Sequence, residues 1–398
     1  MSNRTPARFV ATVKACPGNG IGTPTRQRRL AGYGDPMAAA ARRGRTRRPA
    51  TLASLAAELG ISRTTVSNAY NRPDQLSPQL RQRILEAARR LGYPGPDPVA
   101  RSLRTRKAGA IGLIFTEGLS YAFRDPAAVA FLEGLGLACE AGGAGLLMVP
   151  AAPGDLTAAL VYGAAVDGFV VYSMPAGDPH VTAVLERSVP SVVVDQPVGL
   201  SGVDFVGLDD RGAAAELGRH LGELGHRRVG VVANRLGTDR NDGPADLDRQ
   251  ERCPYAVVKA RLAGFADGLA EHGVDWAEVP VEERFDNSSG AGESAATALL
   301  GRHPELTAVA CTTDVFALAT LAAAGRRGMR VPRELSVTGF DDVPEASAAS
   351  LTTVRQPMLE KGRVAGQLLL DEGERPAARH VLLSTTLVVR NSTGKPRE

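Results

Sequence analysis

The spacing of hydrophobic positions changes once along the chain, close to residue 108. Between residues 51 and 93 apolar side chains recur every three or four positions, a period that predicts three short amphipathic helices. Gly60 ends the first helix, Ser62 is placed to cap the second, and Pro78 opens the third. The short connection between the first two predicts a helix-turn-helix, although an ordinary helical hairpin has the same pattern.

Beyond residue 108, short apolar runs alternate with helical stretches. This alternation predicts an α/β core with doubly wound parallel sheets and helices on both faces, and its length favours two lobes around a cleft. The stretch 238–254 is polar and aperiodic, so we expect a mobile loop there. The predicted buried strands are 110–115, 145–150, 168–172, 190–195, 228–233, 307–311 and 335–340, and the predicted helices include 127–141, 212–224, 257–272, 294–302 and 315–327.

Charge is distributed unevenly between these two regions. The chain carries a formal net charge of only +4, but residues 1–107 hold 21 Lys and Arg against 5 Asp and Glu, and the remainder holds 26 against 38. A basic front on an acidic body indicates a polyanion-binding module, with a solvated basic tail as the alternative. Residues 1–48 have no sustained apolar period, and we expect a disordered basic arm there.

Several classes of protein are disfavoured by what the sequence lacks. The four cysteines are far apart and the six histidines are scattered, so we expect no metal site, no cofactor and no disulfide framework. No apolar run approaches the ~20 residues of a membrane span, and residues 1–13 contain no apolar signal core. Phosphate-binding and nucleophile-elbow motifs are missing as well. We therefore expect a non-enzymatic cytoplasmic protein with no membrane partner.

The exposed side of the second predicted helix carries hydrogen-bonding side chains suited to base edges. Arginine can pair bidentately with guanine, and hydroxyl and amide groups can both donate and accept. A helix with this surface, next to a large basic excess, favours double-stranded DNA as a partner. The residues concerned are Arg63, Thr64, Thr65, Ser67 and Asn68.

Specific runs of residues make the chain resemble the lactose-repressor (LacI) family of transcription factors. The N-terminal part of the match is LAAELGIS at 55–62, TVSN at 65–68, NRP at 71–73 and PVARSL at 98–103. The match continues through the core, for example in VTGFDD at 337–342 and LTTVRQP at 351–357, and it covers roughly residues 51–390. Only the N-terminal arm departs plainly from the family pattern.

The resemblance assigns roles in DNA binding residue by residue. It implies that Arg63, Thr64 and Asn68 read bases and that Ser67 contacts a phosphate or a base. It also implies that the hinge inserts Leu103, with Ala100 beside it, as a wedge into the minor groove, which kinks the duplex. A homodimer would then bind a pseudo-palindromic operator, as its two-fold symmetry requires. The residues implied to hold the DNA backbone are Thr51, Thr65 and Asn71.

Polar and aromatic residues at the ends of the predicted strands indicate a ligand cleft. An arginine and carboxylates beside aromatic rings suit a sugar, whose hydroxyls need hydrogen-bond partners and whose ring faces need apolar contact. Asp341 and its neighbour Asp342 have the alternative role of bracing a loop. The candidates are Tyr121, Phe123, Asp125, Tyr172, Asp195, Arg261, Asn287, Thr313 and Asp341; family members commonly contact the effector at the positions of Arg261, Asn287, Thr313 and Asp341, and Thr313 replaces a frequent Asn.

We therefore expect a helix-turn-helix headpiece over 49–96, a hinge over 97–107 and an effector-binding and dimerisation core over 108–398. Within the core, lobe 1 is expected at about 108–211 and 357–386, and lobe 2 at about 212–351 and 387–396. The predicted function is a repressor controlled by a small carbohydrate and bound to the nucleoid. A cytoplasmic sugar-binding module without sequence-specific DNA recognition is the main alternative, and a hydrolase or isomerase on the same core lacks a catalytic constellation.

Overall fold

The computed structural model describes residues 50–96, 102, 105–115, 118–151, 158–371, 373 and 377–397. The chain forms two compact units, one ending at Pro96 and the other beginning at Asp97, and each is described by itself. The expected basic arm over 1–48 lies outside the described residues, as do Ala100 and Leu103 of the expected hinge.

The first unit is a small helical domain with its own core. Thr51 and Ser54 form a reciprocal capping box at the start of its first helix, and Gly60 ends that helix with a φ of +63°. Leu55, Val66 and Ile84 are fully buried between the helices. The helices are α1 (Leu52–Leu59), α2 (Arg63–Asn71), the 3₁₀ turn η1 (Pro73–Gln75) and α3 (Pro78–Leu91).

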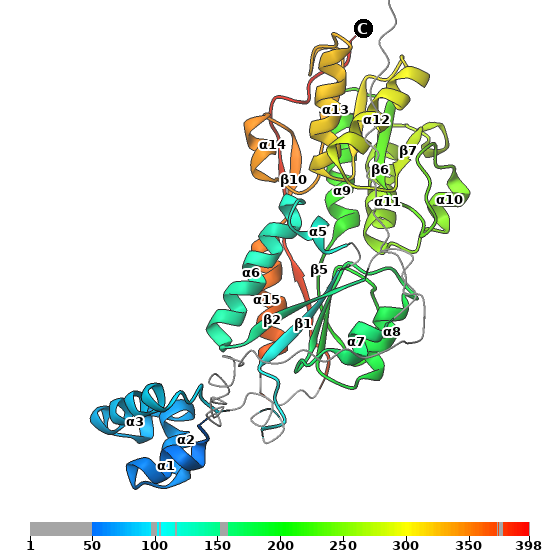
Figure 1. The fold of residues 1–398 in the computed structure, drawn as a ribbon. Helices are drawn as coiled ribbons and strands as arrows, with labels where there is room; N and C mark the ends of the chain where they lie inside the picture. The colour runs from blue at the N-terminus through cyan, green and yellow to red at the C-terminus, as the bar shows by residue number, and fades with distance from the viewer. Residues whose placement is uncertain are drawn as a thin grey trace, which may run out of the picture. The chain divides into compact units, whose positions relative to one another are not determined.

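The second unit begins with a six-stranded parallel sheet, which we call lobe 1 together with its helices (Figure 1). Helices α6 and α15 pack tightly against each other over one face, where a Cβ on Gly134 would lie 1.8 Å from the Leu359 carbonyl oxygen. Helices α7 and α8 cover the other face. In sheet order the strands are β11 (His380–Leu383), β5 (Asp204–Leu208), β4 (Ser191–Val194), β3 (Phe169–Tyr172), β1 (Ala110–Phe115) and β2 (Gly145–Pro150), and the helices are α5 (Leu119–Ala122), α6 (Pro126–Gly142), α7 (Ala159–Gly163), α8 (Pro179–Glu186) and α15 (Met358–Leu370).

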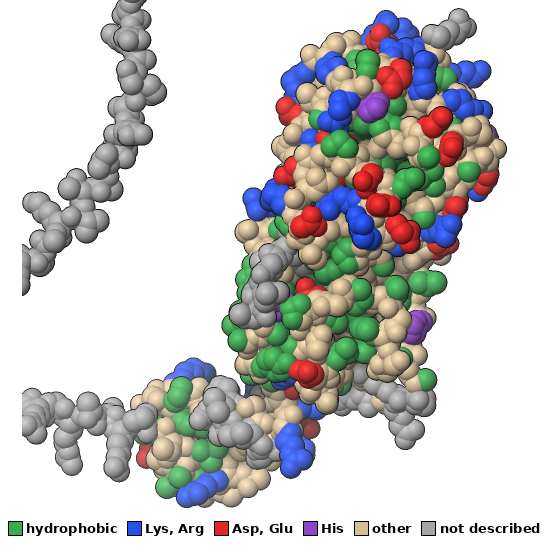
Figure 2. Space-filling view, turned by 90° about the vertical axis from the view of Figure 1, so that its right-hand side faces the viewer, with side chains coloured by type: hydrophobic (Ala, Val, Ile, Leu, Met, Phe, Trp, Pro, Cys, Tyr) green, Lys and Arg blue, Asp and Glu red, His purple; other side chains and the backbone are tan. Residues whose placement is uncertain are grey.

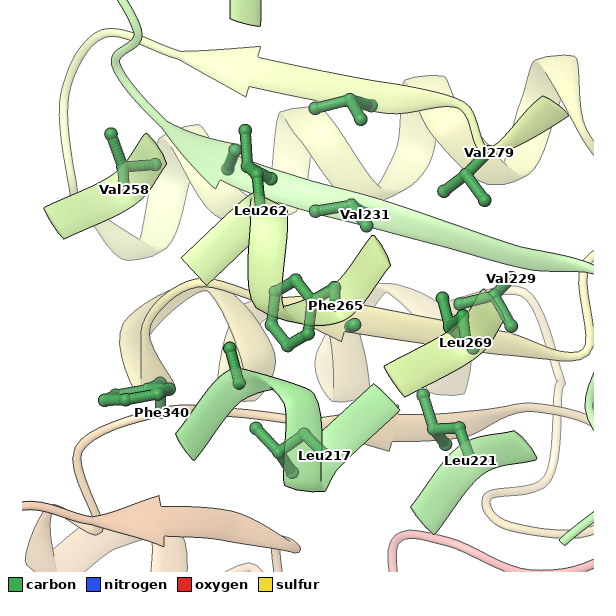
Figure 3. Packing of buried hydrophobic residues seen from close by; sticks show 14 of the residues in the cluster. Leu217, Leu221, Val229, Val231, Val258, Leu262, Phe265, Leu269, Val279 and Phe340 are labelled. Carbon is green, nitrogen blue, oxygen red and sulfur yellow. The ribbon is translucent and has the colours of Figure 1, made fainter. Parts of the chain in front are cut away.

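Lobe 2 is built on a four-stranded parallel sheet, also covered on both faces. Helices α9 and α11 pack on one face around the cluster that contains Leu217, Phe265 and Leu269 (Figure 3), and α12 and α13 pack on the other. In sheet order the strands are β7 (Val281–Arg284), β6 (Val229–Asn234), β8 (Ala308–Cys311) and β9 (Ser336–Thr338), and the helices are α9 (Asp210–Glu223), α10 (Leu247–Glu251), α11 (Ala256–Ala270), η2 (Trp276–Glu278), α12 (Ser289–Arg302), α13 (Asp314–Arg326) and α14 (Pro344–Ala348).

The chain passes between the lobes at three places in the described residues. It crosses from β5 to α9, from β10 (Thr353–Arg355) to α15, and from β11 to β12 (Thr386–Val388). Strands β10 and β12 pair antiparallel and so tie two of these crossings together. The predicted two-lobed, doubly wound core is confirmed, and all helices that the structure describes are too short or too polar to span a membrane.

Some local predictions were wrong for physical reasons. The run at 145–150 forms a strand, but β2 is at the sheet edge and much of it is exposed rather than buried. Strand β7 was missed because its sequence, VEER, is charged, and its Glu282 and Glu283 are buried in ion pairs. The expected mobile loop at 238–254 contains α10 and is tied to β7 by Arg249 and Glu283.

Candidate functional site

A cavity of about 110 Å³ lies between the two lobes, where the carboxyl ends of both parallel sheets meet. Lobe 1 contributes side chains from the ends of β1, β3 and β4, and lobe 2 contributes side chains from the ends of β6 to β9 and from α11. Of the nine residues predicted from the sequence, the structure gathers eight around this cavity: Tyr121, Asp125, Tyr172, Asp195, Arg261, Asn287, Thr313 and Asp341.

Phe123 does not belong to this group. It follows the last residue of α5, and its side chain is 64% exposed. The structure therefore does not bring Phe123 to the cavity, whereas Tyr121 and Asp125 on either side of it line the wall.

Arg261 is held in a fixed orientation by partners on several sides. Its guanidinium donates to Asp210 at 2.9 Å and to the Thr312 carbonyl oxygen at 2.6 Å. It also stacks on the Phe340 ring, with 3.7 Å from Cζ to the ring centre. Burial alone would lower the pKa of Arg261, but the nearby carboxylates raise it, so this side chain remains a cation. Arg261 thus lines the cavity with a cation whose orientation is fixed.

Asp341 is buried opposite this arginine, and its nearest guanidinium nitrogen is 4.0 Å away. Burial and the neighbouring Asp314 raise the pKa of Asp341 well above its ordinary value. Its carboxylate accepts hydrogen bonds from Gln356 and from the backbone N–H of Asp314. Asp342, by contrast, pairs with Arg355 and Arg390 and braces the loop.

A second set of ionic contacts supports the floor of the cavity. Lys361 is 1% exposed, pairs with Asp195 at 2.7 Å and donates to Gln356 at 3.0 Å. Because Gln356 in turn donates to Asp341, one chain of contacts connects the carboxylates of the two lobes. The cavity is therefore lined by both a cationic side chain and acidic side chains, and each of them is held in its orientation by a partner.

The opposite wall contains a hydrogen-bonded chain that passes from lobe 1 to lobe 2. The Tyr121 hydroxyl donates to Asp125 at 2.6 Å and accepts from the Asn287 amide at 2.9 Å. The Asn287 carbonyl oxygen accepts from Thr313 at 3.0 Å, and Thr313 also caps α13. Burial raises the pKa values of both Tyr121 and Asp125, so the phenol stays protonated and can donate.

Sequence reasoning missed several lining residues. Arg235 directly follows β6, so the strand-end rule that selected the other candidates would have found it. Tyr255 and Phe285 were missed because they follow the unexpected α10 and β7. Gln196 spans the lobes, since its amide donates to the Ser173 carbonyl oxygen and its carbonyl oxygen accepts from the Val257 N–H.

The candidate DNA-binding residues occupy two kinds of position in the headpiece. Arg63 and Thr64 are exposed in the first turn of α2. Asn68 donates to Gln75 at 3.2 Å, and Asn71 donates to the Ser67 hydroxyl at 3.0 Å. The remaining two candidates take part in helix capping: Thr51 is the N-cap of α1 and accepts from the Ser54 N–H, and Thr65 donates its N–H to the N-cap of α2, Ser62. No grouping of His, Cys, Asp and Glu suited to a metal ion occurs in the described part of the chain.

Comparison with known proteins identifies relatives along most of the chain. Residues 219–393 match the periplasmic binding protein-like domain. An HTH-type transcriptional regulator of Mycobacterium tuberculosis is 49% identical over 354 residues, which cover 88% of this chain and 98% of the relative.

Solved structures show the same similarity. A LacI-family transcriptional regulator from Corynebacterium glutamicum is 41% identical, with a TM-score of 0.67 over 87% of this chain and 98% of that one. A Thermobifida fusca transcriptional regulator named CelR is a 32% identical relative. A solved structure of a transcriptional regulator CelR in complex with cellobiose is also similar to this chain. That structure is 28% identical, with a TM-score of 0.63 over 86% of this chain and 99% of that one.

Proposed function

Because this chain belongs to the LacI family of HTH-type transcriptional regulators, we propose that it is a repressor controlled by a small carbohydrate. It binds a pseudo-palindromic operator as a homodimer, in the cytoplasm at the nucleoid. The observation that carries the proposal is the pairing of a helix-turn-helix unit with a polar cavity between two lobes.

The chemistry of the cavity supports a carbohydrate as the effector. Arg261, Asp195 and Asp341 provide oriented donors and acceptors for hydroxyl groups. Tyr172 packs its ring against Phe115 and Phe131, with ring centres 4.9 and 4.3 Å apart, and forms an apolar surface for the face of a sugar ring. The cellobiose complex of CelR is consistent with this chemistry.

The headpiece supports sequence-specific recognition of DNA. Arg63 and Thr64 are exposed in the first turn of α2, which supports a role in reading base edges, and Ser67 and Asn68 follow one turn further along the helix. Thr51 at the N-cap of α1, Thr65 in the first turn of α2, and Asn71 hold the phosphate backbone in this proposal through nearby amides and side chains. In the hinge, we keep Leu103 with Ala100 as the proposed minor-groove wedge, although both lie outside the described residues.

An exposed apolar surface supports the homodimer. Val129 and Leu137 on α6 are 44% and 45% exposed, and Leu146 and Leu147 on the adjoining edge strand β2 are 36% and 40% exposed. An uncovered edge strand with apolar side chains favours pairing with another chain. A second copy of the protein would cover this surface.

Control requires that the effector bind one arrangement of the lobes better than another. The cavity is formed by residues of both lobes, so a ligand in it changes the free energy of lobe closure. By linkage, operator binding must change the affinity for the effector by the same factor by which the effector changes the affinity for the operator.

Selection of random duplex DNA by the full-length protein, with and without neutral sugars, tests this function. We expect one inverted repeat to be enriched and one sugar to change the enrichment. If every duplex binds equally under all conditions, the basic residues bind only phosphates and the protein is a sugar-binding module rather than a repressor.

A further inference from the structure

Arg235 lines the cavity between the lobes and is not among the nine cavity residues predicted from the sequence. It directly follows β6 and is only 5% exposed. Its guanidinium lies between two aromatic rings, with 5.5 Å from Cζ to the centre of the Tyr255 ring and 4.9 Å to that of Phe285. A buried arginine between two ring faces has its planar donor edge oriented before a ligand arrives.

The backbone on both sides of Arg235 is fixed by hydrogen bonds. The Asn234 N–H donates to the Thr312 hydroxyl at 3.1 Å, and the Leu236 N–H donates to Glu283 at 2.7 Å. Glu283 is fully buried and also accepts from Arg249 of α10. The stretch 238–254, where the sequence predicted a mobile loop, is thus anchored to β7 close to Arg235 in the sequence.

We propose that Arg235 determines which neutral carbohydrate the cavity accepts, by donating two N–H groups to two adjacent hydroxyl oxygens of the sugar. Guanidinium has donors in a rigid fork and no acceptor, a geometry that matches neighbouring oxygens and that a lysine cannot reproduce. The lining of the same cavity combines the cation of Arg261 with the carboxyl groups of Asp195 and Asp341, a mixture of donors and acceptors that suits the hydroxyl groups of a neutral ligand. This inference rests on the proposed effector function of the cavity.

Arg240, the other arginine that contacts Phe285, offers a matched control substitution. Arg240 lies over the same ring, 4.7 Å from its centre, but its side chain is 55% exposed and pairs with Asp242 and Asp286. It is not part of the cavity lining. Charged side chains of both signs are intermixed on the surface of this lobe, seen in the upper part of Figure 2. Removal of the Arg240 charge from such a surface should therefore have little local effect.

The experiment measures binding by full-length wild type and by the variants Arg235→Met, Arg235→Lys and Arg240→Met. Methionine keeps an unbranched apolar side chain that can pack on the rings but removes the charge and every N–H donor, and lysine keeps the charge without the planar fork. The probes are glucose, galactose, ribose, maltose and cellobiose, with glucuronic acid and glucose 6-phosphate as anionic counterparts. Binding is followed by calorimetry, and the melting temperature of each unliganded variant shows that it is folded.

We expect wild type and Arg240→Met to bind the same neutral sugar with the same Kd, and both Arg235 variants to bind it at least tenfold more weakly. If the Arg235 variants retain the wild-type Kd within twofold, the inference is wrong while the effector function stands. A preference of wild type for the anionic probes also overturns it. Failure of folded wild type to bind any probe removes the proposed effector function, and the role of Arg235 with it.

Discussion

The hydroxyl of Tyr121 in lobe 1 accepts a hydrogen bond from the amide of Asn287 in lobe 2, at 2.9 Å. The same hydroxyl donates to Asp125, and Asn287 in turn accepts from Thr313. The two lobes are therefore joined at the wall of the cavity by side chains that also line it. A ligand in the cavity would contact the groups that hold the lobes together, so its binding would act directly on lobe geometry.

Removing this hydroxyl should weaken effector binding more than it weakens the fold. Tyr121→Phe removes the acceptor of the Asn287 amide and one of the donors to Asp125, and we expect a five- to tenfold loss of sugar affinity. Tyr162→Phe is the control, since Tyr162 is half exposed and its hydroxyl bonds Glu186 on the surface. Calorimetric titration with the sugar that wild type binds measures both. Equal affinities for the two variants would contradict a role for the Tyr121–Asn287 contact.

DNA recognition should depend on Arg63 through base contacts rather than through charge alone. Arg63→Met is expected to reduce affinity for the selected operator by tenfold or more and to reduce affinity for a scrambled duplex much less. Arg90→Met removes the same charge from α3, where Arg90 pairs with Glu58. Fluorescence anisotropy at fixed salt compares the variants. A similar loss on both duplexes from Arg63→Met would assign this side chain to phosphate contact.

Self-association should depend on one edge of the six-stranded sheet. Leu147→Glu places a charge on the exposed edge strand β2, and we expect the dimer to dissociate at concentrations where wild type is dimeric. Leu382→Glu makes the same change on β11, at the opposite edge, where Leu382 is 65% exposed. Sedimentation velocity distinguishes them. Dissociation by the β11 variant alone would place the interface at the other edge.

His226 predicts a pH dependence of stability. Its ring is fully buried and bonds Thr307, Ser336 and the carbonyl oxygen of Gly394, and burial lowers its pKa to about 4 from the ordinary 6.5. Between pH 6.5 and 4 the unfolded chain binds a proton at this site and the folded chain does not, so stability falls as the pH is lowered through that window. The loss over the whole window is about 3 kcal/mol.

The comparison with His226→Gln isolates this contribution. The free energy of unfolding is measured with urea at pH 7.5 and at pH 4.5 for both proteins. Wild type should lose more stability than the variant between these two values. If the two proteins lose the same amount, His226 is charged in the folded state or titrates elsewhere.

The sequence predicted the fold class, most of the parallel strands of both lobes and eight of the residues that gather around the cavity. These predictions succeeded because buried strands are continuous apolar runs and because polar residues at their carboxyl ends converge on one cleft. Strand β7 could not be found in this way, since Glu282 and Glu283 are polar residues whose burial depends on distant arginines. Tyr255 shares this limit, because its place in the cavity depends on the segment that Glu283 anchors, whereas Arg235 directly follows β6 and obeys the strand-end rule.

We propose that the cavity between the lobes binds a sugar and is coupled to DNA binding by the headpiece. The most direct test is the Kd of the effector sugar for the free protein and for the protein saturated with its operator. We predict that the two values differ at least fivefold, and that operator affinity with and without sugar changes by the same factor. Identical sugar affinities for the free and the operator-bound protein would contradict the account.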